Sequence, residues 1–160
     1  MNGNWSSGKI HTISVSSRRG IKKVNVPAAT LIAGVGIDGD AHAGPGPRQV
    51  SLLSWEAIQA FNTRGVSCAP GDFAENICAT GLDFSAIKPG TRILVGEDAE
   101  LQVSRIGKEC HAPCRIAQEA GDCIMPKEGV FAVVVRGGII RVGDSVGVLP
   151  ANQNAENVHV

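Results

Sequence analysis

Short apolar segments separated by glycine-containing turns run along most of the chain. Apolar and polar residues alternate in residues 9–15 and 100–106, which predicts β-strands that bury one face. Further strands are predicted where turn residues bound short apolar runs, at residues 22–26, 48–53, 92–95, 129–136, 139–142 and 145–149. Short strands at such regular spacing favour a closed or nearly closed β-barrel.

Two segments interrupt the strand pattern as short helices. Ser54 is a suitable N-cap for a helix that continues to Phe61, in which Trp55, Ile58 and Phe61 recur every three residues and share one face. Residues 116–120 allow one or two further helical turns. The repeated glycines of residues 31–44 exclude a regular helix and predict a long loop. The expected fold class is therefore mostly β, a barrel with a few short helices.

Length and hydropathy indicate one soluble domain. A chain of 160 residues can bury a core without disulfides. We expect a single β-barrel domain over residues 1–150 and a polar, disordered tail over residues 151–160. No apolar run reaches the roughly 20 residues of a membrane-spanning helix, and the first residues lack a secretory signal. We therefore expect a cytoplasmic protein without a membrane partner.

The balance of charges excludes a global attraction for anions. Lys and Arg number 15, Asp and Glu also number 15, and the formal net charge is +0 at pH 7. No surface pattern of basic and aromatic residues accompanies this balance, so a nucleic-acid partner is not expected. Any anion site must therefore be local.

The strongest candidate for chemistry is a segment that contains two cysteines. Cys110 and Cys114 lie four residues apart, with Lys108, His111 and Arg115 around them. Neighbouring positive charge favours the thiolate, the form that acts as a nucleophile or as a ligand for a soft metal. We therefore expect a functional role for at least one of the two thiols.

Other interpretations of the cysteines remain open. The chain has five cysteines, an odd number, which does not suit a framework of paired disulfides. Free cysteines are often small buried core residues. Cys110, His111, Cys114 and Cys123 could alternatively hold a tetrahedral zinc ion, although only one cysteine pair has the spacing usual in structural zinc sites. Cys123 suits the core and a third thiol of the site equally.

A second candidate site is the glycine-rich loop with the arginine that follows it. Glycines let the backbone approach a ligand closely, Arg48 can bind a phosphate or carboxylate through two N–H groups, and His42 is a candidate donor. Further along the chain, we expect Asp72 to cap a turn and Glu75 to lie in solvent. Asn76 is expected to satisfy loop backbone or to contact a ligand.

The ordered set of these segments resembles the MOSC domain family, named for the C-terminal domain of molybdenum-cofactor sulfurases. The resemblance is carried by residues 36–44, 48–52, 70–77, 81–83, 90–93, 108–116 and 143–144. It implies a MOSC-type β-barrel that handles sulfur or binds the molybdenum cofactor (molybdopterin). One position departs from the pattern, because Ala41 stands where many relatives have a basic residue, and this removes one anion contact.

The resemblance also implies roles for individual residues. Cys114 matches the family's cysteine, which is proposed to carry sulfur as a persulfide or to ligate molybdenum, and Cys110 is then a second or resolving thiol. Arg48, Lys108 and Arg115 are candidate donors to the pterin phosphate. The candidate cofactor-binding residues are His42, Arg48, Asn76, Lys108, His111 and Arg115.

Three functions are consistent with these residues. The first is a sulfur carrier or cofactor-binding domain, whose partner is the molybdenum cofactor or a sulfur-donor protein. The second is a molybdenum-cofactor-dependent reductase subunit for small N-hydroxylated or sulfoxide-like substrates, which needs a separate electron donor. The third is a non-catalytic β-barrel that zinc stabilises.

Overall fold

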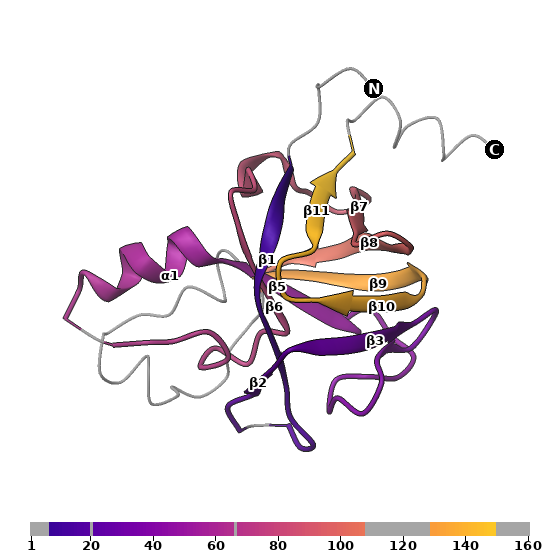
Figure 1. The fold of residues 1–160 in the computed structure, drawn as a ribbon, viewed down its shortest axis with the longest axis horizontal. Coiled ribbons are helices and arrows are strands. Elements are labelled where there is room, and N and C mark those ends of the chain that lie inside the picture. Colours follow the sequence, from indigo (N-terminus) through magenta and orange to yellow (C-terminus); the bar gives the residue numbers. More distant parts are fainter. Residues whose placement is uncertain (1–6, 20, 66, 108–128, 150–160) are drawn as a thin grey trace.

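The computed structural model in Figure 1 describes residues 7–19, 21–65, 67–107 and 129–149. Its elements, in chain order, are β1 (Ser7–Val15), β2 (Val24–Val26), β3 (Ala28–Ile32), β4 (Gly36–Ile37), β5 (Val50–Ser54), α1 (Trp55–Asn62), β6 (Ile77–Thr80), the 3-10 helix η1 (Phe84–Ala86), β7 (Arg92–Val95), β8 (Ala99–Ile106), β9 (Val130–Arg136), β10 (Gly138–Arg141) and β11 (Ser145–Val148). The predicted tail, residues 151–160, and the predicted helical turns at residues 116–120 lie outside the described residues.

Seven strands close into a barrel, which confirms the predicted fold class. The strand order is β11-β7-β8-β9-β5-β6-β1, and pairing of β11 with β1 completes the ring. Neighbouring strands are antiparallel except β5 and β6, which are parallel because the connection through α1 returns the chain to the end where β5 began. β2 extends the barrel sheet at β1, and β10, β3 and β4 form a separate sheet.

The long loop predicted for residues 31–44 contains regular structure at its start. β3 pairs with β10, and the two residues of β4 pair with the end of β3. The partner strand β10 comes from near the other end of the chain. Local sequence cannot indicate such a pairing, because a strand this short is stabilised mainly by its neighbour.

Two apolar clusters form the core, one inside the barrel and one under α1. Leu52 faces the barrel interior, whereas the adjacent Leu53 packs with Ile58 and Phe61 of α1. Successive side chains of a strand point to opposite faces, so β5 contributes to both clusters. Cys68 and Cys78 are buried in the cluster under α1 and therefore act as core residues.

The predicted helix is confirmed together with its cap. The Ser54 hydroxyl accepts a hydrogen bond from the Ala57 amide at 3.1 Å, as an N-cap does. Ile58 and Phe61 are buried, and Trp55 is partly buried against the same cluster. The three-residue spacing thus marks the face that α1 turns toward the barrel.

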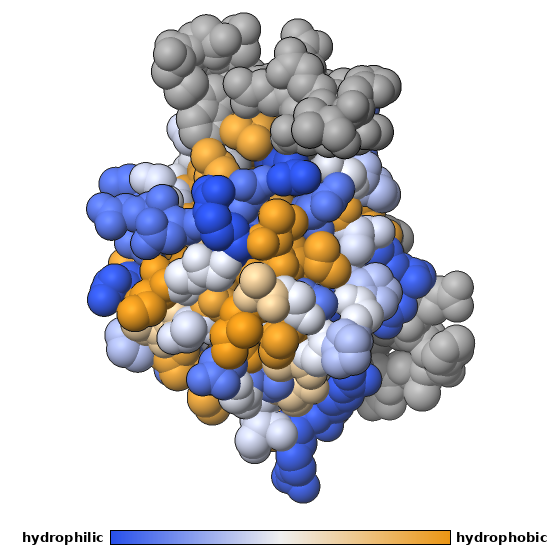
Figure 2. Space-filling model, turned by 90° about the vertical axis from the view of Figure 1, so that its right-hand side faces the viewer, coloured by the Kyte–Doolittle hydropathy of each residue, from blue (hydrophilic) through white to orange (hydrophobic). Residues whose placement is uncertain are grey.

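Apolar side chains also gather on one outer face of the molecule. Figure 2 shows this face, which lies on the side where β3, β9 and β10 come together in Figure 1. These strands carry the exposed Ile32, Val135 and Ile139. At the edge strand β10, the Arg141 amide donates to Asp144 Oδ2 at 2.9 Å, so this amide is not available to pair with another strand.

Glu75 is buried, which corrects the expectation that it lies in solvent. Its side chain accepts hydrogen bonds from the amides of Gly71 (2.7 Å) and Phe73 (3.2 Å) and leaves the residue 1% exposed. Burial raises the pKa of Glu75 to about 7, although these hydrogen bonds favour the ionised form. Asp72 caps the preceding turn as predicted, because its carboxylate accepts from the Ala69 amide at 2.9 Å. The loop between α1 and β6 is therefore packed against the rest of the protein at Glu75, and its polar sequence did not indicate this burial.

Glu75 should make the free energy of unfolding decrease as the pH rises. The folded protein holds this proton to a pKa of about 7, against about 4.3 for an unfolded Glu. The stabilisation is therefore complete below a pH of about 4.3 and is lost as the pH rises through about 7, by about 4 kcal/mol in total. Carboxyl carbon NMR should give Glu75 a titration midpoint near 7, and urea unfolding should follow the same pH range.

Glu75→Gln provides the control, because an amide does not titrate. Whatever its absolute stability, this variant should lose the decrease in unfolding free energy between pH 5 and pH 8. A midpoint near the ordinary Glu value in the NMR titration would contradict the assignment.

Candidate functional site

A surface pocket of about 400 Å³ lies beside the glycine-rich loop, and its volume is in the range of small-molecule sites. It brings together His42 and Arg48, two of the predicted site residues. Its lining consists of Arg19, His42, Pro45, Gly46, Pro47, Arg48, Arg105 and Phe131. These residues come from the turn after β1, the loop that precedes β5, and strands β8 and β9.

Three arginines make the pocket positive. The Arg48 guanidinium lies over the Phe131 ring at 5.5 Å, Arg19 Nε donates to Ala41 O at 3.4 Å, and Arg105 Nε donates to Gly107 O at 3.1 Å. Within the described part of the chain, none of the three guanidinium groups forms an ion pair with a carboxylate. Three guanidinium groups around one hollow favour an anion there, and a local site of this kind is compatible with the neutral net charge.

Sequence reasoning found Arg48 but missed Arg19 and Arg105. Arg19 belongs to a polar turn and Arg105 to an alternating strand, where a charged residue is ordinarily solvated. Only the tertiary structure places both residues beside the loop that carries Arg48. The Ser104 hydroxyl helps to hold this arrangement, because it donates to the carbonyls of Pro47 and Phe131.

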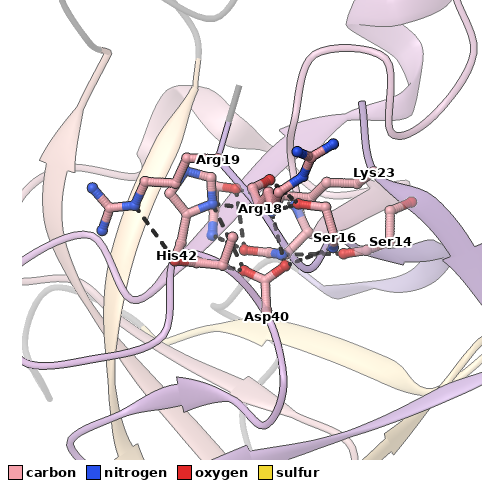
Figure 3. Close-up of polar contacts among 10 residues, drawn as sticks. Ser14, Ser16, Arg18, Arg19, Lys23, Asp40 and His42 are labelled. Carbon is pink, nitrogen blue, oxygen red and sulfur yellow. Dashed lines mark hydrogen bonds and ion pairs between the residues drawn. The ribbon is translucent and has the colours of Figure 1, made fainter. Parts of the chain in front are cut away.

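A buried ion pair anchors the wall of the pocket (Figure 3). Lys23 Nζ lies 2.8 Å from Asp40 Oδ1, and both side chains are 0% exposed. Asp40 also accepts hydrogen bonds from the amides of Ser16 (3.0 Å) and His42 (3.1 Å). Burial alone would raise the pKa of Asp40, but the neighbouring side chains of His42 and Lys23 and the amides of Ser16 and His42 outweigh it and hold the pKa below its usual range.

His42 connects this ion pair with the pocket. Its Nδ1 lies 3.0 Å from Lys23 Nζ, and its side chain, 27% exposed, lines the pocket. The ring is thus held from its buried side. The predicted role of His42 as a donor is consistent with this position, because the buried contact uses only one ring nitrogen.

Gly36 allows the glycine-rich loop to pack closely against the neighbouring segment of the chain. At Gly36, where φ is +124°, a Cβ atom would lie 2.7 Å from Gln49 O. The buried Gln49 side chain donates to Gly34 O and accepts from the Val134 amide, each at 3.0 Å. The close backbone approach expected at this loop is therefore, at Gly36, an approach to the neighbouring segment of the protein.

Asn76 supports the backbone and does not line the pocket. It is 1% exposed, its side-chain oxygen accepts from the Ser51 amide at 3.0 Å, and its amide nitrogen donates to Ser14 O at 3.1 Å. This is the first of the two roles predicted for the residue. It ties β5 and β1 together at the point where β6 begins.

The remaining predicted site residues lie outside the described residues. They are Lys108, Cys110, His111, Cys114, Arg115 and Cys123. The two ends of their segment are described: the Gly107 amide donates to Gly129 O at 2.6 Å, so the chain leaves β8 and returns to β9 at one point of the barrel. That point adjoins the pocket, because Gly107 accepts the hydrogen bond of Arg105.

Other kinds of site find little support in the part of the chain that the structure describes. There, no group of three or more His, Cys, Asp or Glu residues could hold a metal ion. Cys78 is a core thiol whose pKa is raised by burial. The described helices are also too short or too polar to cross a membrane.

Known structures share this fold. The YuaD protein of Bacillus subtilis superimposes with a TM-score of 0.75 at 20% sequence identity, covering 90% of this chain and 97% of YuaD. YiiM from Geobacillus stearothermophilus gives 0.67 at 21% identity, with 89% and 75% covered. YiiM from Escherichia coli gives 0.63 at 18% identity, with 89% and 70% covered. At such identities the likeness establishes the fold alone.

Sequence comparison identifies the family. The comparison with curated proteins gives no match. The MOSC domain profile, however, matches residues 38–147, a stretch that begins in the loop of Asp40 and ends within β11. The match spans most of the chain and includes most of the residues on which the resemblance rested. This chain therefore belongs to the MOSC domain family.

Proposed function

We propose that this chain is a molybdenum-cofactor-associated domain that binds the cofactor or carries sulfur for it. In this proposal the pocket binds the phosphate of molybdopterin, and Cys114 carries a persulfide or ligates molybdenum. The observation that carries the proposal is the set of three guanidinium groups, of Arg19, Arg48 and Arg105, which surround one pocket without carboxylate partners in the described part of the chain.

The pocket residues fit a phosphate group. A phosphate ester offers several acceptor oxygens, and guanidinium groups bind such oxygens through pairs of parallel N–H bonds. In the described part of the chain, Arg19 and Arg105 each form a hydrogen bond through Nε alone, so their terminal nitrogens could bind a ligand. The Arg48 guanidinium lies over the Phe131 ring at 5.5 Å, and among the described residues its N–H groups form no hydrogen bond.

Covalent geometry limits the distance between the predicted thiols and this pocket. Cys110 follows Gly107 by three residues and Cys114 follows it by seven. A fully extended chain spans at most about 3.6 Å per residue, so their Cα atoms lie within about 11 Å and about 25 Å of Gly107. Because Gly107 itself contacts Arg105 of the pocket, one ligand could meet both the arginines and a thiol.

The chemistry asked of Cys114 is simple nucleophilic displacement. A thiolate attacks the outer sulfur of a donor persulfide, the sulfur–sulfur bond of the donor breaks, and the donor leaves as a thiolate while Cys114 becomes the persulfide. Neighbouring Lys108, His111 and Arg115 favour the attacking thiolate. The partner is then a sulfur-donor protein, and we infer the cytoplasm as the place of the exchange because thiols stay reduced there.

Bound cofactor would add the redox chemistry of molybdenum. The residues of this chain would hold its phosphate in the pocket and offer the thiol as a ligand. The reductase alternative uses the same residues together with an external electron donor, so molybdenum content alone distinguishes it from a pure sulfur carrier. The zinc alternative instead requires stoichiometric zinc and unfolding on chelation.

Arg48→Met should weaken cofactor retention, because it removes a charged donor and keeps an apolar side chain over Phe131. Loss of one hydrogen bond to a charged group predicts about tenfold less bound pterin. The measurement is pterin fluorescence of extracts from protein purified out of cells that make the cofactor. Arg141→Met is the matched control, because Arg141 is exposed on β10 and does not line the pocket. Equal pterin in both variants would count against the pocket.

Alkylation should locate the reactive thiol. Cys68 and Cys78 are buried at 7% and 1% exposure, so they should not react in the folded protein. Cys114 should react with iodoacetamide at pH 7 faster than a free cysteine, whose pKa is about 8.5. Peptide mass spectrometry should find the fast label on Cys114.

Two serine variants test the assignment of this thiol. Cys114→Ser should remove the fast label together with any added sulfur on the native protein, whereas Cys110→Ser should keep both. Fast labelling that survives in Cys114→Ser would show that another thiol is the reactive one.

A further inference from the structure

We infer that Lys23 is a positioning residue that, with Asp40, fixes His42 in the Nε2–H tautomer, so that His42 donates a hydrogen bond to an oxyanion in the pocket. The inference deepens the proposed function, on which it rests for the identity of the ligand. The tautomer itself is a property of the free protein.

The three protons of the Lys23 ammonium group have three acceptors. Nζ lies 2.8 Å from Asp40 Oδ1, 3.2 Å from Ser16 Oγ and 3.0 Å from His42 Nδ1 (Figure 3). The Ser16 hydroxyl donates its own proton to Arg18 O at 3.0 Å, so toward Lys23 it must accept. An ammonium group cannot accept a hydrogen bond, and His42 Nδ1 must therefore present a lone pair to it.

The alternative partner for Nδ1 is too distant. A proton on Nδ1 would have to be donated to Asp40 Oδ2, which lies 3.7 Å away. Asp40 Oδ2 is already occupied by the amide of His42 at 3.1 Å. The distances therefore favour the contact with Lys23 by a wide margin and place the ring proton on Nε2.

This tautomer determines what the pocket can bind. With Nδ1 committed to Lys23, the remaining ring nitrogen of His42 carries a proton and is a donor. The arginines of the pocket likewise offer only N–H groups, so the polar side chains that line it are all donors within the described part of the chain. A metal ion at Nε2 would require the ring proton to move to Nδ1, where it would face the Lys23 ammonium. The ligand class is an oxyanion, such as a phosphate monoester.

The burial of Lys23 also indicates a positioning role. Both members of its pair with Asp40 are 0% exposed, and such a pair costs desolvation free energy that apolar residues of similar size would not. Lys23 also contacts two polar side chains, Ser16 after β1 and His42 in the glycine-rich loop. They fix the relative position of the segments that line one side of the pocket.

The tautomer can be measured directly on the free protein by nitrogen–proton NMR correlation of the imidazole. We expect Nε2–H for His42 in the wild type and a mixture of both tautomers in Lys23→Met. Should Lys23→Met fold poorly, Lys23→Met/Asp40→Asn removes both charges together and is expected to give the same mixture. Lys22→Met is the matched control, because Lys22 is 64% exposed and pairs with Asp72 instead.

Titration with inorganic phosphate then tests the role of the donor. Phosphate should shift the His42 Nε2–H signal in the wild type and in Lys22→Met, and its affinity in the charge-neutral double variant should fall with the share of Nε2–H tautomer lost, about twofold for an equal mixture. A wild-type ring that carries its proton on Nδ1, or a tautomer unchanged in the variants, would overturn the inference. A correct tautomer in a protein that retains no pterin would leave the inference standing and contradict the proposed function.

Discussion

The ion pair between Lys23 and Asp40 is the interaction on which the pocket depends. It lies where the end of β1, the start of β2 and the glycine-rich loop meet, and no regular hydrogen-bond ladder joins all three there. Ser16 adds backbone contacts, because its amide binds Asp40 and its carbonyl accepts from the Ala41 amide at 2.8 Å. Separating the pair would leave a buried charge without its partner, which costs free energy. The three segments are therefore expected to hold their relative positions as one unit.

The barrel supplies the rigid side of the same site. Arg105 and Phe131 stand opposite each other on β8 and β9, whose pairing is interrupted by an irregularity between Val103 and Arg105. Such irregularities bend a strand and redirect its side chains. The segment with the predicted thiols also begins and ends between these two strands. A ligand in the pocket would therefore contact both a fixed pair of strands and the base of that segment.

The general architecture could be predicted from the sequence because strand signals are local. Alternation identified the core of β1 and of β8, and Ser54 with its apolar spacing identified α1. β6 was missed because it is buried on both faces, so its sequence shows no alternation, and because it is paired with β1 and β5 on either side. Glu75 was assigned to solvent because its burial depends on the folded loop. Its carboxylate binds the amides of Gly71 and Phe73, and the sequence does not show that the loop brings these groups together.

The site was only half predictable, because its residues come from segments that sequence spacing does not relate. His42 and Arg48 belong to a recognisable motif. Arg19 and Arg105 belong to a turn and to a strand, and only the folded chain brings them to that motif. The roles predicted for Cys110 and Cys114 stay predictions, since these residues lie outside the described part of the chain.

Arg19 also bears on the one position where this chain departs from the family pattern. Ala41 lacks the basic side chain that many relatives carry there, and the departure alone would weaken an anion site. Its backbone nevertheless holds a cation in place, because the Ala41 carbonyl accepts from Arg19 Nε at 3.4 Å. Arg19 lines the pocket from the turn after β1, and the Ser16 amide at the start of this turn binds Asp40 of the glycine-rich loop. Arg19 therefore brings positive charge beside position 41 from another segment of the chain.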